Sequence, residues 1–104
     1  MADSEWVQMT AGVKRRIKED GEKVMLIEVR FEAGAAVAAH SHPHEQATYV
    51  ASGRMEFTVD GKLIEVGAGE SLLLRSNVPH AARALEASVI VDAFSPPRED
   101  LRAT

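Results

Sequence analysis

The sequence predicts an all-β fold, a small sandwich or barrel, from three observations. Its 104 residues are enough for one domain and no more. Apolar and polar residues alternate with a period of two in several short segments, whereas a helical period is hard to find. Glycines separate these segments at short intervals. Many short strands with glycine-rich turns are typical of a β-sandwich or barrel.

Two segments show the alternation best. In residues 23–32 the apolar side chains of one parity are Met25, Ile27, Val29 and Phe31. In residues 54–60 they are Met55, Phe57 and Val59. Asp60-Gly61 then offers the two residues of a tight hairpin turn, which needs positive φ, and residues 62–66 return as the partner strand. Further strands are expected at Val13–Lys18, Gln46–Ala51, Ser71–Arg75, His80–Leu85 and Ser88–Phe94.

Composition excludes several classes of protein. Twelve Lys and Arg against sixteen Asp and Glu give a net charge of −4, which argues against nucleic acid and against anionic membranes as partners. The absence of cysteine excludes disulfides, thiolate metal sites and a cysteine nucleophile. The chain has no apolar stretch of membrane-spanning length, and its polar start, Met1–Glu5, lacks the basic region of a signal peptide. We therefore expect a cytoplasmic protein.

Two features of the sequence bear on contacts with other molecules: the edges of the predicted sheets and a run of basic residues. A chain made mostly of strands must protect its edges, and dimerisation by strand exchange or edge pairing does so, which leads us to expect a homodimer. Trp6 and the N-terminal strand are candidates for that contact, and Trp6 as a lid over one end of its own barrel is an equal alternative. We interpret the basic run of residues 14–18 as a solvated strand face rather than an anion patch; its charged members are Lys14, Arg15, Arg16 and Lys18.

Three of the four histidines, His40, His42 and His44, fall within five residues. Side chains two apart on a strand share a face, so His40 and His42 can converge on one ion. Gln46 can offer an amide oxygen from across a bend, and His80 can arrive from a separate strand. The alternative is a chance surface cluster, but the run leads directly into a strand. We therefore predict one divalent transition metal ion, Zn, Ni, Fe or Mn, among which spacing does not choose.

The spacing of these residues resembles that of the cupin family. The first cupin motif is matched by Gly34, His40-Ser41-His42, Gln46 and Gly53, with Gln46 where most cupins carry Glu. The second motif is matched less fully, by Gly69 and His80, while Arg75, Asn77 and Ala84 replace its Pro, Gly and Asn. Asn77 can take a left-handed conformation much as Gly does. The resemblance implies a single cupin domain over residues 1–104, a double-stranded β-helix or jelly-roll barrel. Its barrel is expected at about 13–95, between a short polar N-terminal segment and a C-terminal tail after Pro96-Pro97.

A narrower resemblance is to the small cupins of the KdgF type. It rests on the run from His40 to Gln46 and on the string from Asp92 through Phe94 to Arg98. Those proteins open the ring of 4,5-unsaturated monouronates from pectin and alginate breakdown, giving the 4-deoxy-5-keto form. The resemblance implies a metal held by His40, His42, Gln46 and His80. It also implies a pocket lined by Asp92, Phe94 and Arg98.

Asp92 stands in a segment that is apolar on both parities, where a lone carboxylate is costly to bury unless it is paired or functional. If Ile90, Asp92 and Phe94 point inward, Asp92 faces the metal cavity with a raised pKa, suited to acid–base catalysis. The alternative is an ion pair with Arg98 or Arg83. Arg98 can bind a substrate carboxylate in bidentate fashion or be a solvated charge, and Phe94 can be core or substrate platform.

Three His and one Gln are neutral ligands, so the ion keeps its full charge and acts as a stronger Lewis acid. The leading hypothesis is therefore a metal-dependent enzyme with Asp92 and Arg98 as catalytic residues, Phe94 and Arg98 binding substrate, and a small anionic, sugar-acid-like substrate. One alternative is a non-catalytic cupin that binds or senses a small anion, and another is a cupin dioxygenase. Glu45 is a rival ligand that breaks the family spacing, and His44 is either a pocket group or exposed.

Overall fold

The computed structural model describes residues 4–102, so residues 1–3 of the polar N-terminal segment and residues 103–104 of the tail lie outside the described part. Within residues 4–102 the chain forms ten strands and one short helix. The strands are β1 (Val7–Thr10), β2 (Val13–Asp20), β3 (Met25–Phe31), β4 (Ala36–His40), β5 (Glu45–Ser52), β6 (Arg54–Val59), β7 (Lys62–Gly67), β8 (Ser71–Leu74), β9 (His80–Ala84) and β10 (Ser88–Ser95); the helix is α1 (Glu99–Arg102).

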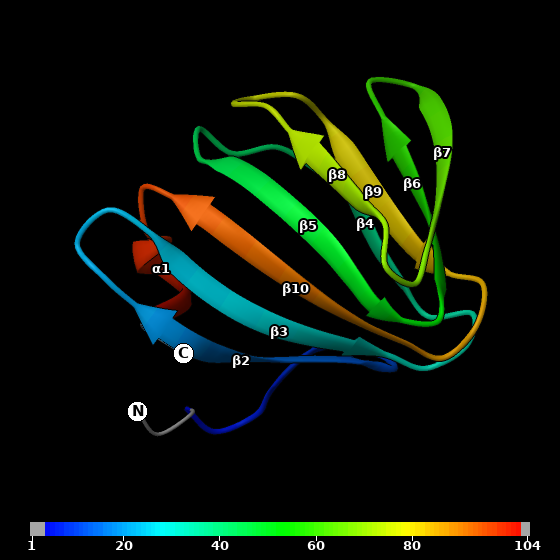
Figure 1. The fold of residues 1–104 in the computed structure, drawn as a ribbon, viewed down its shortest axis with the longest axis horizontal. Helices are drawn as coiled ribbons and strands as arrows, with labels where there is room; N and C mark the ends of the chain where they lie inside the picture. Colours follow the sequence, from blue (N-terminus) through cyan, green and yellow to red (C-terminus); the bar gives the residue numbers. More distant parts are fainter. Residues whose placement is uncertain (1–3, 103–104) are drawn as a thin grey trace.

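The strands form two antiparallel sheets that face each other (Figure 1). One sheet has the order β1-β2-β3-β10-β5-β8 and the other β4-β9-β6-β7. Strands distant in the chain are neighbours: β10 lies between β3 and β5, and β9 between β4 and β6. The all-β jelly-roll fold predicted from the sequence is thereby confirmed.

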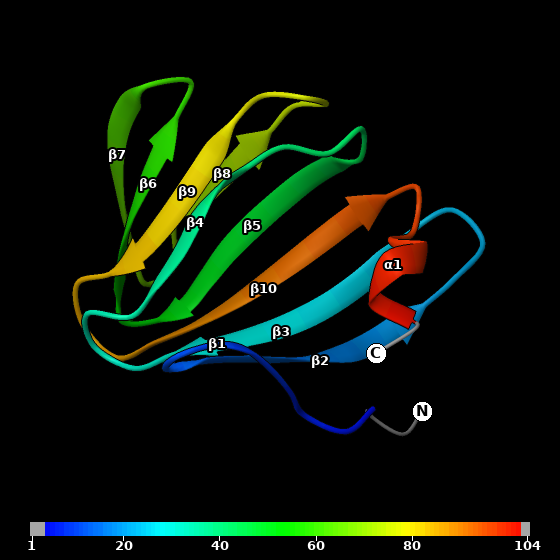
Figure 2. The same cartoon turned by 180° about the vertical axis from the view of Figure 1, so that it is seen from behind.

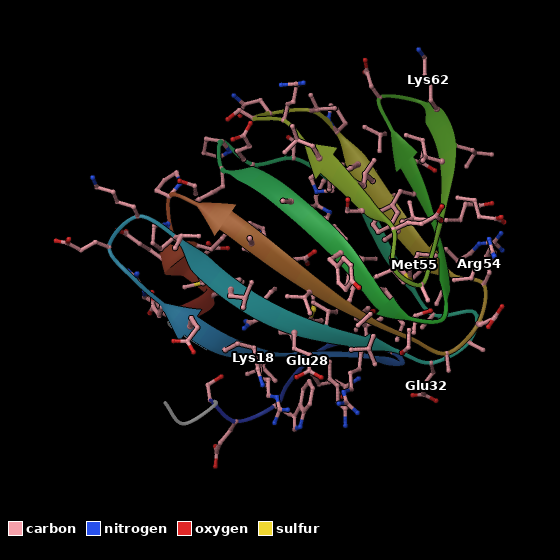
Figure 3. All side chains as sticks on the ribbon, in the orientation of Figure 1. Lys18, Glu28, Glu32, Arg54, Met55 and Lys62 are labelled. Carbon is pink, nitrogen blue, oxygen red and sulfur yellow. The ribbon has the colours of Figure 1, made fainter. Side chains whose placement is uncertain are left out.

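The core lies between the two sheets and follows the predicted alternation. The four apolar residues of β3 that share a parity are each at most 4% exposed, and Met55 and Phe57 of β6 are buried with them. Figure 3 shows Met55 on β6 near the end of the barrel where β5 turns into β6. Burying a large apolar side chain stabilises a fold by about 1.5–3 kcal/mol, so this pattern accounts for the closure of the two sheets.

Turn chemistry fixes the register of the strands. Asp60 and Gly61 have φ of 50° and 81° and join β6 to β7, as the hairpin prediction requires. Gly53, between β5 and β6, has φ of 87° and packs directly against Ser88, where a Cβ would overlap the neighbouring atoms. Asn77 takes the left-handed conformation expected of it, with φ of 64°.

Three elements were not predicted. The strands β1 and β4 lack an alternating pattern, and β4 is mostly alanine, which has low strand propensity. The helix α1 is a single turn, too short for a helical period, and lies beside β2 and β3 (Figure 2). Among the described residues, no helix has the length and apolar character needed to cross a membrane.

Trp6 lies against charged side chains on the outer face of the six-stranded sheet, so the alternative in which it covers one end of its own barrel is wrong, while its part in a dimer contact stays a prediction. Its ring is covered by the charged groups of Arg16, Lys14 and Arg30 at 4.4, 4.7 and 5.4 Å from the centroid. Cations held over an aromatic face are attracted to its electrons. Trp6 therefore organises part of the basic run on the outside of the barrel.

The same outer face carries a buried carboxylate, Glu28 of β3. It forms ion pairs with Arg30 and Arg16 at 2.8 and 3.0 Å and with Lys18 at 3.8 Å. Figure 3 shows Lys18 and Glu28 together on the side of β2 and β3 that faces away from the four-stranded sheet. Much of the basic run is thus used within the fold rather than presented freely to solvent.

Candidate active site

Strand pairing brings the histidines together. In the antiparallel pair of β4 and β9, His40 lies opposite His80, because the register shifts by a bulge after Val37. His42 comes from the loop after β4, so the expectation that it shares a strand face with His40 is wrong: the strand ends at His40. One ring nitrogen from each of the three histidines lies within 4.8 Å of the other two.

The loop that carries His42 is held in place from the β8–β9 connection. The backbone N–H of Asn77 donates to the His42 carbonyl at 2.8 Å, and the Ser76 hydroxyl donates to the Pro43 carbonyl. Asn77 makes this contact from a left-handed backbone conformation, with φ of 64°. These two hydrogen bonds fix the position of the loop after β4, and with it the position of His42.

Each of the three rings is oriented by a backbone carbonyl that accepts its Nδ1–H. The acceptors for His40, His42 and His80 are Ala38, His44 and Val78, at 2.9, 3.0 and 2.9 Å. Burial lowers the pKa of both His42 and His80, which favours neutral rings whose one proton is on Nδ1. The Nε2 lone pairs are then available, and the buried Nε2 of His80 has no hydrogen-bond partner within the described part of the chain. Rings fixed in this tautomer by a carbonyl are typical of metal ligands.

Gln46 lies beside this group on β5. Its Oε1 is 3.1 Å from Nε2 of His42, so two atoms with lone pairs face each other, an arrangement that a cation stabilises. Gln46 is buried, whereas the neighbouring Glu45 is exposed on the other face of the strand, as strand alternation dictates. The residues therefore fit a metal ion, with Gln46 rather than Glu45 available as a fourth ligand.

His44 does not belong to the group of three. Its carbonyl orients His42, and its ring packs against that of His42 with centroids 5.5 Å apart. The side chain is half-buried and borders a second cavity together with Asp100 and Glu22.

Asp92 points into the barrel from β10, as predicted. It lies opposite Thr48 of β5, whose hydroxyl donates to Asp92 Oδ1 at 2.6 Å, and Gln46 Nε2 donates to the Thr48 hydroxyl at 3.0 Å. Burial raises the pKa of Asp92 to about 6, against the opposing effect of hydrogen bonds from Thr48 and Gln46 and of the Arg98 charge. The expected rise in pKa is confirmed, and Thr48 is a site residue that the sequence reasoning missed.

Within residues 4–102, Asp92 forms no ion pair with either of the two arginines suggested as partners. Arg83 pairs with Glu56 at 3.1 Å, and its side chain is largely exposed. Arg98 donates two hydrogen bonds to Asp100, at 2.8 and 3.2 Å. Both arginines proposed as partners are therefore engaged elsewhere.

Phe94 and Arg98 stack at the edge of the site. The Arg98 guanidinium lies 5.0 Å from the centroid of the Phe94 ring, and that ring also packs edge-on against His42 at 5.7 Å. Phe94 is only 2% exposed and belongs to the core cluster while forming part of the cavity wall. The two interpretations of Phe94, core and platform, are therefore compatible.

A cavity of about 380 Å³ between the two sheets connects these groups. Apolar side chains form most of its wall, and its polar members are Arg15, His40, Gln46, His80, Asp92 and Arg98. Cavities of a few hundred Å³ with a few convergent polar groups are typical of small-molecule sites.

Arg15 corrects the interpretation of the basic run as a solvated face. The side chain is 5% exposed and lines the cavity, whereas Lys14 is exposed. The missed signal was parity: Arg15 shares its strand face with Val13 and Ile17, both apolar and packed in or against the core.

The comparisons with known proteins agree with this fold. A family model described as a cupin domain matches residues 27–94. Among curated proteins, the pectin degradation protein KdgF of Dickeya dadantii is 33% identical over 100 residues, which cover 94% of this chain and 91% of that protein.

Two solved cupin structures match the fold of this chain closely. KdgF from a Halomonas species matches with a TM-score of 0.89 at 31% identity, covering 93% of this chain and 90% of the other. An RmlC-like cupin from Shewanella frigidimarina also matches with a TM-score of 0.89, at 32% identity, covering 94% and 88%. Because the family model covers more than half of the chain and the curated relative nearly all of it, this chain belongs to the cupin family.

Proposed function

We propose that this protein is a metal-dependent cupin that opens the ring of 4,5-unsaturated monouronates released from pectin or alginate. Its similarity to a protein named for pectin degradation supports the substrate class. The observation that carries the proposal is Asp92: a buried carboxyl, with its pKa raised to about 6, shares a cavity with His40 and His80 of the three-histidine group. A carboxyl with a pKa near neutrality is suited to giving and taking a proton.

The proposed metal ligands are His40, His42, His80 and Gln46, for one divalent ion such as Zn, Ni, Fe or Mn. When bound, the ion would act as a Lewis acid that polarises substrate oxygens. All four ligands are neutral, so none of its charge would be cancelled by the protein.

Asp92 is the proposed proton-transfer group. In the ring opening the C1 hydroxyl loses a proton, the bond between C1 and the ring oxygen breaks, C4 gains a proton and C5 becomes a ketone, so the product is an isomer. Asp92 can give the proton that C4 gains and recover the proton that C1 loses. Thr48 holds the carboxyl in place through the 2.6 Å hydrogen bond.

Phe94 and Arg98 are the proposed substrate-binding residues. The Phe94 ring offers an apolar wall for the sugar, and the Arg98 guanidinium provides positive charge at the cavity edge. The mostly apolar wall limits water, which strengthens the electrostatic contacts inside.

The test combines elemental analysis with turnover. Untagged protein is purified without chelator, its bound metal is quantified, and the product of a pectate or alginate lyase is added. We expect loss of the absorbance of the unsaturated uronate faster than its spontaneous opening, abolished by chelation and by Asp92→Asn with metal still bound. Glu65→Gln, at an exposed ion pair with Arg54, is the matched control and should retain activity.

Three results would contradict the proposal. Full activity of Asp92→Asn would show that Asp92 does not transfer the proton in the reaction. Stoichiometric metal without any acceleration would favour the alternative of a cupin that binds a small anion, and oxygen consumption would favour a dioxygenase.

A homodimer remains a prediction of the strand-edge argument. The edges of the six-stranded sheet are β1 and β8, and either can pair with a second copy. Sedimentation equilibrium over a range of concentrations measures the mass directly, and a monomer at all concentrations would contradict it.

A further inference from the structure

The hydroxyl of Thr48 lies between a proposed metal ligand and the proposed proton-transfer group. Gln46 and Thr48 are two residues apart on β5 and therefore share its inner face, and Asp92 lies opposite Thr48 on β10. Gln46, Thr48 and Asp92 are 6%, 1% and 5% exposed. Their polar groups are therefore removed from bulk water and need partners within the protein.

The direction of the hydrogen bonds in this group follows from the single proton of the hydroxyl. Thr48 donates that proton to Asp92 Oδ1 at 2.6 Å. The hydroxyl oxygen therefore meets Gln46 as an acceptor, and it receives a hydrogen bond from Gln46 Nε2 at 3.0 Å. Asp92 favours the same end of the amide, because a carboxylate accepts from the Gln46 N–H group and repels a carbonyl oxygen.

Because its nitrogen is held by Thr48, the Gln46 amide turns its oxygen toward the histidines. Gln46 Oε1 lies 3.1 Å from Nε2 of His42, whose other ring nitrogen donates to the His44 carbonyl, so both facing atoms carry lone pairs. An amide free to rotate beside this ring would take the reverse orientation and donate its N–H to the His42 lone pair. The reverse orientation would present N–H groups, which do not bind a cation, where a ligand oxygen is needed.

We propose that Thr48 is the positioning residue that makes Gln46 a metal ligand, by holding the amide nitrogen so that the amide oxygen faces the ion. The inference rests on the proposed function for the metal site and deepens it by naming the residue that orients the fourth ligand. The same hydroxyl holds Asp92, so the fourth ligand and the proposed proton-transfer group are positioned together. A partner that orients a ligand contributes to metal affinity without touching the ion.

The test measures the Zn²⁺ affinity of metal-free protein by competition with a chromophoric chelator. Thr48→Val keeps the shape of the side chain and removes the hydroxyl, and it should weaken Zn²⁺ binding about tenfold or more. Thr48→Ser keeps the hydroxyl and should restore the affinity. Thr58→Val is the matched control, because Thr58 lies on the face of β6 that does not carry Met55 and Phe57, and it should bind Zn²⁺ as the wild type does.

A second background separates the orientation of the amide from general packing. Gln46→Glu places an oxygen at both ends of the terminal group, so no partner is needed to choose between them. Thr48→Val should therefore cost far less Zn²⁺ affinity in the Gln46→Glu background than in the wild-type background. Thermal melting of each variant establishes that it is folded, and if Thr48→Val does not fold, Thr48→Ala removes the same hydroxyl and takes its place.

The inference is overturned if Thr48→Val binds Zn²⁺ as tightly as the wild type, if Thr48→Ser does not restore the affinity, or if the loss is equal in the two backgrounds. The same preparations are given the lyase product. Zn²⁺ binding that depends on the Thr48 hydroxyl, without ring opening by the wild-type protein, would refute the ring-opening proposal and leave the role of Thr48 intact. Ring opening by the wild type, with unchanged Zn²⁺ affinity in Thr48→Val, would refute the role of Thr48 alone.

Discussion

Replacing Asp92 by Asn should change how the stability of the metal-free protein depends on pH. The pKa of Asp92 is raised from an ordinary value of 3.8 to about 6, because burial disfavours the carboxylate. The folded chain therefore binds this proton more tightly than the unfolded chain. As pH rises from below the unfolded value to above about 6, the fold must hold a desolvated charge, and its stability falls.

The size of the effect follows from the shift. A pKa difference of about 2 corresponds to roughly 3 kcal/mol of unfolding free energy, at about 1.4 kcal/mol for each unit. Asn is neutral at every pH in this range, and its oxygen can still accept the hydrogen bond that Thr48 donates to Asp92. The variant should therefore lack this loss of stability.

The assay is urea unfolding of chelator-treated wild-type and Asp92→Asn protein at about pH 4 and about pH 8. Other titrating groups are common to both proteins and largely cancel in the difference between them. We expect that difference to move by about 3 kcal/mol in favour of the variant at the higher pH. Glu65→Gln, at an exposed site, should show no comparable movement. Parallel pH profiles for wild type and Asp92→Asn would refute the argument that burial sets the acidity of this carboxyl.

Three further predictions concern packing and the metal. Gly53→Ala should destabilise the protein by more than about 3 kcal/mol in urea unfolding, because the new Cβ overlaps atoms of the adjacent strand, whereas Gly61→Ala, with open space around it, should cost only about 1 kcal/mol. Met55→Ala removes a fully buried side chain and should cost about 2–5 kcal/mol in the same assay. Gln46→Glu should keep metal, by elemental analysis, but slow ring opening because a carboxylate ligand weakens the Lewis acid, and His80→Ala should lose the metal.

Each of these has an outcome that would contradict it. Equal stability of the two glycine variants would mean that the backbone around Gly53 relaxes freely. The exposed Leu63→Ala, expected within about 0.5 kcal/mol of wild type, is the control for Met55, and a similar cost at both would contradict the core assignment. Faster ring opening by Gln46→Glu would contradict the Lewis-acid argument.

Much of the barrel could be predicted because local chemistry and tertiary structure agree. Asp60-Gly61 forms the predicted hairpin, and the alternation of β3, β6 and β10 sets which side chains are buried. The inward position of Asp92 followed from its parity with Ile90 and Phe94. In each case a period of two leaves only one way to bury the apolar face.

The other features of the fold and the site could not be predicted, because they depend on contacts between residues that are distant in the sequence. The alanine-rich β4 becomes a strand because it pairs with β9, and the position of His42 depends on a loop held by Asn77. The chain of hydrogen bonds through Thr48 links residues far apart in the sequence. Arg15 was misread because a run of basic residues suggests solvent exposure, although its parity pointed inward.

The proposed metal ligands come from both sheets: His40 and His80 from the four-stranded sheet, and Gln46 from the six-stranded one. In a chain without cysteine, an ion shared by them would serve as the cross-link that a disulfide provides elsewhere. Chelation should then raise amide hydrogen exchange first in β4 and at the start of β5, while the hairpin of β6 and β7 stays protected. The ion would thus couple activity to the joining of the two sheets at His40, His80 and Gln46, so that a protein without metal would be both inactive and less tightly closed there.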